Sequence, residues 1–209
     1  MKRSSSFRLP GPTRGLSIGV MGGTFDPPHS GHAHVIETAR KRLGLDWVWV
    51  LPARGNPLKT TQTPFSARFA LARDYLSGPR TRVSPMEEEL GLTYTIDVLR
   101  TLKRLAPDAR FVWLMGADNL ANFHHWRDWR GIAALAPIAV VSRPGSFPHA
   151  GLSRFARQYA ACRQTGDRNG ALARARPPAW RLLQARLDPA SSTELRDRAN
   201  PAANAPAAD

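Results

Sequence analysis

The chain has 209 residues, of which 42% are hydrophobic, and its formal net charge at pH 7 is +14. This apolar content suffices for one sizeable core, and no apolar run approaches the roughly 20 residues that a membrane helix needs. We therefore expect one domain over residues 16–199 that does not span a membrane, with a disordered extension over 1–15 and a flexible tail over 200–209.

The positive charge is also what a nucleic-acid-binding protein would show. Residues 151–186 contain eight arginines and one aspartate, but these are spread among alanine, leucine and tyrosine rather than gathered in a basic tail. This pattern is typical of the solvated faces of helices, so nucleic-acid binding is kept only as the less favoured alternative. The single cysteine, Cys162, cannot form an intrachain disulfide and is typical of the reducing cytoplasm.

Short apolar runs alternate along the chain with segments whose apolar residues recur at helical spacing. Such alternation predicts an α/β fold with a Rossmann-like, doubly wound, mostly parallel sheet and helices on both faces. The stretch 144–178 has the weakest pattern and is expected to cover one edge of the sheet. The expected strands are 18–21, 47–51, 82–84, 111–115, 138–141 and 180–183, and the expected helices are 31–43, 65–76 and 94–105.

The most distinctive segment runs from Gly22 to His32, between the first expected strand and the first expected helix. Its glycine-rich turn lies where an open α/β sheet binds phosphate, at the positive end of a helix dipole. His29 and His32 are three residues apart, so they share one side of the first helical turn. The spacing differs from the dinucleotide fingerprint, the P-loop and the zincin motif, and it offers histidine rather than lysine to the phosphate.

This segment resembles the G-x-F-x-P-x-H-x-G-H signature of the nucleotidylyltransferase superfamily, whose members join a nucleotide to a phosphate-bearing acceptor and release pyrophosphate. Residues 191–196, Ser-Ser-Thr-Glu-Leu-Arg, are similar to the I-S-S-T-x-x-R motif that holds the triphosphate in that superfamily. Residues 116–127 resemble a segment typical of its bacterial nicotinate-nucleotide adenylyltransferase branch, and residues 93–97 and 142–145 fit the same branch. The resemblance spans about residues 16–198 and implies the same Rossmann-like architecture.

The resemblance implies transfer of the adenylyl group of ATP to nicotinate mononucleotide, which gives nicotinate adenine dinucleotide and pyrophosphate. It assigns the catalytic role at the α-phosphate to His29 and His32, and Mg²⁺ is expected to accompany ATP, bound mainly by phosphates and water. The matching tryptophan, Trp126, would stack on the pyridine ring, while Thr95 and backbone N–H groups around Trp126 and Arg127 would meet the nicotinate carboxylate. The residues expected to bind ATP are Gly22, Gly23, Thr24, Phe25, Lys59, Gly116, Asp118, Ser192, Thr193 and Arg196.

Several of these residues also have purely structural interpretations. His32 is placed where a histidine caps or packs against a helix start, Asp118 where it caps a helix, and residues 191–193 form an ordinary helix-start pattern. Lys59 is equally compatible with a solvated loop position. The acceptor also stays open at this point, because nicotinamide mononucleotide and phosphopantetheine are acceptors for the same chemistry. Trp47, Trp49 and Trp113 lie in strand runs and are expected to pack in the core.

Overall fold

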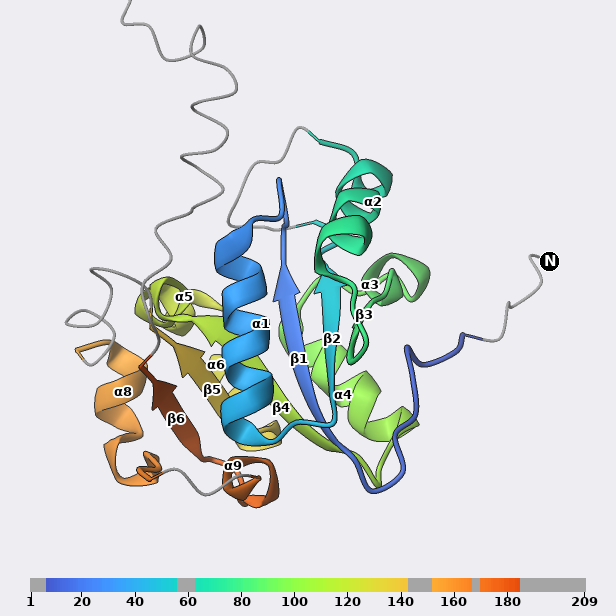
Figure 1. Ribbon diagram of the computed structural model, residues 1–209. Coiled ribbons are helices and arrows are strands. Elements are labelled where there is room, and N and C mark those ends of the chain that lie inside the picture. The colour runs from blue at the N-terminus through green and yellow to red at the C-terminus, as the bar shows by residue number, and fades with distance from the viewer. Residues whose placement is uncertain (1–6, 56–62, 143–151, 167–169, 185–209) are drawn as a thin grey trace, which may run out of the picture.

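The computed structural model describes residues 7–55, 63–142, 152–166 and 170–184 (Figure 1). Its centre is a six-stranded sheet of order β3-β2-β1-β4-β5-β6, in which all neighbouring strands are parallel. This is the doubly wound order, with its reversal between β1 and β4, so the predicted fold is confirmed. The strands are β1 (Ser17–Gly23), β2 (Trp47–Pro52), β3 (Thr81–Val83), β4 (Arg110–Gly116), β5 (Ile138–Val141) and β6 (Trp180–Leu183).

The three longest helices of the described part are the three that the apolar spacing predicts, and their bounds agree with the prediction to within one residue. These are α1 (Ser30–Leu43), α2 (Phe65–Leu76) and α4 (Thr95–Leu105). None of the helices in the described ranges is long and apolar enough to cross a membrane. The shorter elements are α3 (Met86–Glu89), α5 (Ala117–Asn122), α6 (Trp129–Leu135), α8 (Arg154–Gln158), α9 (Ala171–Arg174) and the 3-10 helices η1 (Phe123–His125) and η2 (Ala160–Cys162).

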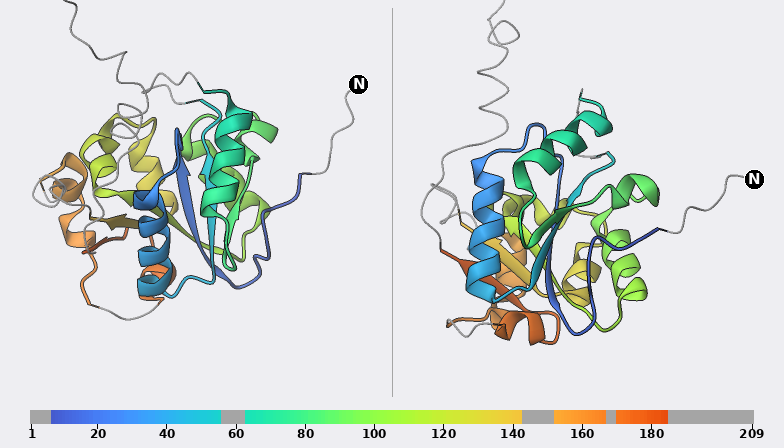
Figure 2. Two further views of the ribbon diagram at one scale, coloured as in Figure 1. Left: turned by 45° about the horizontal axis from the view of Figure 1, so that its top comes forward. Right: turned by 45° about the vertical axis from the view of Figure 1, so that its right-hand side comes forward.

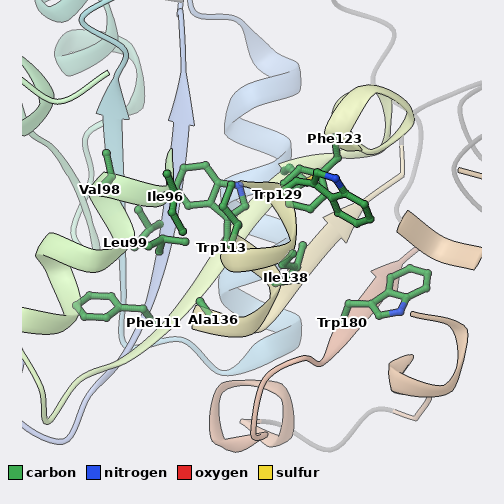
Figure 3. Close-up of a cluster of buried hydrophobic side chains, with 14 of the residues drawn as sticks. Ile96, Val98, Leu99, Phe111, Trp113, Phe123, Trp129, Ala136, Ile138 and Trp180 are labelled. Atoms are coloured by element: carbon green, nitrogen blue, oxygen red, sulfur yellow. The ribbon is translucent and has the colours of Figure 1, made fainter. Parts of the chain in front are cut away.

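Both faces of the sheet are buried, because successive strand residues belong to two different apolar clusters. In β2, Trp49 packs in one cluster and Val50 in the other, and Trp113 and Leu114 of β4 divide in the same way. The first cluster is closed by helices α3, α4, α5, α6 and α8, and part of it is drawn in Figure 3. The second is closed by α1, α2 and α9, so α1 and α2 lie on the face of the sheet opposite to α4 (Figure 2).

The expected core tryptophans are present: Trp49 and Trp113 are buried, whereas Trp47 is only partly buried at the margin of the first cluster. Each fully buried aliphatic side chain, such as Leu99 of α4, contributes about 1.5–3 kcal/mol relative to an exposed one. Part of the stretch 144–178 lies at the β6 edge, since Phe155 of α8 contacts the Trp180 ring, whereas α9 packs against α1 and β4.

The beginning of the described chain also packs on the domain. Phe7 and Leu9 lie against the first cluster, and the Arg110 side chain donates to the Gly15 carbonyl over 2.8 Å. Residues 7–15 are therefore in contact with the core rather than extended away from it. The domain bounds at 16 and 199 stay a prediction, and the expected tail over 200–209 lies outside the described residues.

Candidate active site

The end of β1 is held close to the neighbouring strand β4. A Cβ at Gly22 would lie 2.7 Å from Cη2 of Trp113, so only glycine allows the backbone to approach this ring. Phe25 follows in the left-handed region, with φ of +50°, and its buried ring packs edge-on against His32 at 4.8 Å between centroids. The turn is thus a fixed backbone segment at the carboxyl end of β1, next to the point where the strand order reverses.

The two histidines cap the start of α1 reciprocally. His29 is the N-cap residue, and its Nδ1 accepts the Gly31 N–H over 3.1 Å, while Nδ1 of His32 accepts the His29 N–H over 3.2 Å. Their rings lie 3.8 Å apart between centroids, and His29 is only 4% exposed. Because each Nδ1 accepts a backbone N–H, the neutral rings carry their proton on Nε2.

In this arrangement His32 can cap the helix and bind a ligand at the same time. The cap uses Nδ1, so the Nε2–H of each ring is the donor that the side chain can present to an anion. The first turn of α1 contains no acidic residue, and its last turn contains Arg40, Lys41 and Arg42. The charges therefore complement the helix dipole at the C-terminal end, and no acidic side chain of the first turn opposes the attraction of its positive N-terminal end for anions.

Two buried ionisable residues lie beside this turn, and neither was predicted from the sequence. Arg68 of α2 is 2% exposed and donates to the Thr24 carbonyl over 2.7 Å. Glu87 of α3 is 5% exposed, and its Oε2 accepts the Arg54 N–H over 3.3 Å. Burial raises the pKa of Glu87 to about 8, against the opposing effects of the Arg54 N–H and of Arg68. Burial likewise lowers the pKa of Arg68.

A sequence signal for Arg68 existed, because it shares the buried side of α2 with Ala72 and Leu76. A charged residue at i, with apolar residues at i+4 and i+8, lies on the core-facing side of a helix. Glu87 gave no comparable signal, since it begins a run of three glutamates of which the other two are exposed.

The carboxyl end of β4 brings Gly116 and Asp118 to the same edge of the sheet as the turn after β1. Gly116 is the N-cap of α5, and Asp118 is an exposed residue of its first turn. The interpretation of Asp118 as a helix cap is therefore wrong. Its carboxylate lies instead where the helix dipole favours negative charge.

The residues expected to bind the acceptor come together from two segments. Thr95 is the first residue of α4, and the preceding residue, Tyr94, has the Arg127 guanidinium over its ring at 4.5 Å. Trp126 is partly buried and meets the rings of Phe123 and Trp113 edge-on, at 5.3 and 6.3 Å between centroids. Trp113 therefore contacts both Trp126 and the backbone at Gly22, and links the two parts of the candidate site.

Four of the expected ATP-binding residues, Lys59, Ser192, Thr193 and Arg196, lie outside the described residues. The other expected residues lie at the carboxyl edge of the sheet, at the N-terminus of α1 or on the segments around Thr95 and Trp126. Within the described ranges, no group of three or more histidine, cysteine, aspartate or glutamate side chains could hold a metal ion.

Comparison with known proteins agrees with this geometry. The cytidylyltransferase-like family model matches residues 20–198. The protein named "Probable nicotinate-nucleotide adenylyltransferase" of Ruegeria sp. (strain TM1040) is 46% identical over 184 residues, covering 88% of this chain and 97% of that protein. The protein of the same name from Rhizobium meliloti (strain 1021) is 45% identical over 183 residues, covering 87% of this chain and 97% of that protein.

Among solved structures, the chain is similar to nicotinic acid mononucleotide adenylyltransferase of Plasmodium falciparum, determined in complex with NaAD. The TM-score is 0.64 at 19% sequence identity, and the match covers 87% of this chain and 83% of that one. A second structure of the same protein, in complex with APC, has a TM-score of 0.62 at 18% identity, with the same coverage of both chains. These likenesses concern the fold.

Proposed function

The chain belongs to the cytidylyltransferase-like family and, within it, to the nicotinate-nucleotide adenylyltransferases, and from this we propose how its residues divide the work of the reaction. The enzyme transfers the adenylyl group of ATP to nicotinate mononucleotide, a step of NAD biosynthesis, and releases pyrophosphate. The roles below are assigned from the contacts at the carboxyl edge of the sheet.

In the reaction, a phosphate oxygen of nicotinate mononucleotide attacks the α-phosphorus of ATP. A new P–O bond forms as the bond from the α-phosphorus to the bridging oxygen breaks, and the electron pair leaves with pyrophosphate. Negative charge builds on the α-phosphate oxygens and the leaving group, so donors must be oriented in advance. The attacking oxygen is already ionised, and the step therefore needs no general base and no covalent enzyme intermediate.

The observation that carries this proposal is the reciprocal cap of His29 and His32. It holds both imidazoles in the tautomer with a proton on Nε2, at the positive end of α1. We assign both Nε2–H donors to the α-phosphate, together with backbone N–H groups of the turn at Gly22, Gly23 and Thr24. Phe25 acts through packing, because its buried ring supports His32.

Acceptor recognition is assigned to Trp126 and the two segments that meet beside it. The indole stacks on the pyridine ring, and its edge contacts with Phe123 and Trp113 hold its plane. The Trp126 N–H already donates to the Phe123 carbonyl over 3.0 Å, so we assign the carboxylate to the Arg127 N–H and the Thr95 hydroxyl. A carboxylate accepts from both donors, whereas an amide would set its own NH₂ against one of them.

The family acts on ATP with a divalent metal, and we propose Mg²⁺ as that metal. An ion that arrives with ATP would be held mainly by phosphate oxygens and water, and it needs few protein ligands. Asp118, exposed in the first turn of α5 just after β4, is the carboxylate that we assign to the ATP side, toward the ribose or the metal. Bound to the triphosphate, Mg²⁺ would neutralise charge on the leaving pyrophosphate.

Four further assignments rest on the motifs alone, since their residues lie outside the described ranges. Lys59, Ser192, Thr193 and Arg196 are proposed to bind the triphosphate, with the forked guanidinium of Arg196 suited to the β- and γ-phosphates. A cytoplasmic location is proposed from the single cysteine of the chain.

The test is pyrophosphate release from ATP and Mg²⁺ with three acceptors: nicotinate mononucleotide, nicotinamide mononucleotide and phosphopantetheine. We expect nicotinate mononucleotide to be preferred to its amide by about 10²-fold or more in kcat/KM, because a mismatched buried polar group is rejected strongly. Thr95→Val should narrow this preference, whereas Thr101→Val, six residues further along α4, should leave it unchanged. Equal values for the two mononucleotides would reject the carboxylate site, and a mobility shift with random duplex at physiological salt would support the nucleic-acid alternative.

A further inference from the structure

The Arg68 guanidinium is buried beside the phosphate-binding turn and donates to four backbone carbonyls. Helix α2 stands next to the carboxyl ends of β1 and β2 (Figure 1) and carries Arg68 on its buried side. Nη1 donates to the carbonyls of Thr24, over 2.7 Å, and Ala53, over 2.9 Å. Nε donates to Thr63 over 3.2 Å, and Nη2 to Arg54 over 3.5 Å.

These acceptors belong to three separate segments: the turn after β1, the end of β2 and the residue before the N-cap of α2. One side chain therefore fixes the turn relative to the two segments beside it. A buried cation is costly unless it is well hydrogen-bonded, and Arg68 meets this requirement with its four backbone carbonyls. Glu87 lies close enough to influence Arg68 electrostatically, and it anchors the Arg54 N–H next to one of the four carbonyls.

The bond to Thr24 sets the direction of the next backbone donor. The Thr24–Phe25 peptide is trans, so its N–H points opposite to its C=O and therefore away from Arg68. The residues that the structure describes offer no acceptor to this Phe25 N–H. Phe25 is 1% exposed, and buried backbone donors in proteins are nearly always paired with protein, water or ligand. The positive φ of Phe25 also requires outside contacts to hold it.

We propose that Arg68 is a positioning residue for adenylyl transfer: it holds the Thr24–Phe25 peptide so that the Phe25 N–H is offered to the ATP phosphates beside His29 and His32. The inference rests on the proposed function. It assigns to Arg68 no contact with either substrate. Its effect on turnover passes through the backbone of the turn.

The two short bonds to Thr24 and Ala53 leave from one nitrogen, and this makes a discriminating pair of variants available. Arg68→Lys provides a single cationic nitrogen for those two carbonyls and loses the bonds to Thr63 and Arg54. Arg68→Met removes all four bonds. If Arg68 positions the peptide, Arg68→Lys should keep kcat within about threefold, while Arg68→Met should lower kcat by about 10- to 100-fold, as small misplacements at a reacting centre do. The KM for nicotinate mononucleotide should stay unchanged in both.

The matched control is Arg73→Met, on the same helix, because the Arg73 side chain is 60% exposed and pairs with Asp74 on the surface. It should leave kcat and both KM values unchanged. The double variant Arg68→Met/Glu87→Gln replaces the buried carboxyl group together with the guanidinium, so Glu87 is not left without its partner, which keeps the experiment usable if Arg68→Met does not fold. We expect the double variant to fold and to show the same loss of kcat.

Full turnover by the folded double variant, with only its melting temperature lowered, would overturn the inference and leave Arg68 a structural residue. A loss of kcat in Arg68→Lys as large as in Arg68→Met would overturn it as well, since the bonds to Thr24 and Ala53 would then not matter. A parent enzyme that releases no pyrophosphate with nicotinate mononucleotide would instead overturn the proposed function itself, and this inference with it.

Discussion

The phosphate end and the acceptor end of the candidate site are built in different ways. At the phosphate end, an 11-residue segment from Gly22 to His32 supplies the turn, the cap and both histidines, and buried Arg68 and Glu87 support it. At the acceptor end, residues from α4 and from the segment after η1 meet through contacts that are largely exposed, such as Arg127 over Tyr94. The chemistry is thus encoded locally and held rigidly, whereas acceptor choice depends on tertiary contacts.

The contacts at the two ends should differ in strength, because those at the phosphate end are buried and those at the acceptor end are exposed. Buried hydrogen bonds to charged groups are worth about 1.5–3 kcal/mol each. The Arg100–Asp128 pair near the acceptor end has side chains that are 58% and 45% exposed, and such surface pairs contribute about 0–1 kcal/mol. Substitutions at the phosphate end should therefore act on turnover and stability, and those at the acceptor end on the KM of one substrate.

The largest effect is expected for the histidines. His32→Ala should lower kcat by about 10²- to 10³-fold while ATP affinity changes little, because its donor matters most as charge develops in the transition state. His34→Ala, two residues further along α1, should keep kcat near that of the parent. Steady-state kinetics and ATP titration measure both quantities. Near-normal turnover of a folded His32→Ala protein would contradict the assignment.

His29 allows the cap to be separated from the donor. His29→Asn supplies an oxygen that accepts the Gly31 N–H, so it should preserve stability, whereas His29→Ala should lose about 1 kcal/mol through the missing cap. Both variants should lose turnover like His32→Ala, since neither places an Nε2–H at the phosphate. A His29→Asn enzyme with full turnover would reduce His29 to a capping residue.

The second effect concerns the pH dependence of stability at the phosphate end. Burial raises the pKa of Glu87 from 4.5 to about 8, so between these values the folded state keeps a proton that the unfolded state releases. The contribution of this proton to the free energy of unfolding is fully present below pH 4.5 and falls as the pH rises. By about pH 8 the protein has lost a few kcal/mol of stability. Glu87→Gln should lack this slope in urea unfolding at pH 5, 6, 7 and 8. If the free energy of unfolding of parent and variant depended on pH in the same way, Glu87 would be ionised in the folded protein over this whole pH range.

How far the sequence predicts the molecule depends on the same distinction between local and tertiary contacts. Residues 65–76, 138–141 and 180–183 form the expected elements at the expected bounds, because apolar periodicity and proline boundaries are local. Short helices such as α6 and α9 were not predicted, since one or two turns carry too few residues for a period to show. The His29–His32 pair was predictable from one segment. The contacts of Arg68 and Tyr94 were not, because each joins parts of the chain whose proximity only the fold determines.

At the acceptor end, Trp126→Ala should raise the KM for nicotinate mononucleotide by about 10- to 100-fold, since stacking on a flat base is worth about 1–3 kcal/mol. The KM for ATP should stay unchanged, and Trp126→Phe should recover part of the loss because a smaller ring still stacks. Initial rates with each substrate varied in turn distinguish these effects. If Trp126→Ala raised the KM for ATP alone, Trp126 would belong to the ATP site, and the division into a phosphate end and an acceptor end would be wrong.

The smallest effect tests whether the exposed contact at the acceptor end orders the segment that carries the carboxylate donor. Exposed cation–π contacts are worth about 0.5–1 kcal/mol, so Arg127→Ala should raise the KM for nicotinate mononucleotide about two- to fivefold through a less ordered Arg127 N–H. Tyr94→Leu should have the same effect, and the double variant should add little, because both single changes remove one interaction. Arg130→Ala is the matched control: it removes an arginine stacked on Trp129 at 5.0 Å on α6, and should leave this KM unchanged. Additive losses in the Arg127–Tyr94 cycle would show that the two residues act separately, and that the acceptor end is held by the buried edge contacts of Trp126 instead.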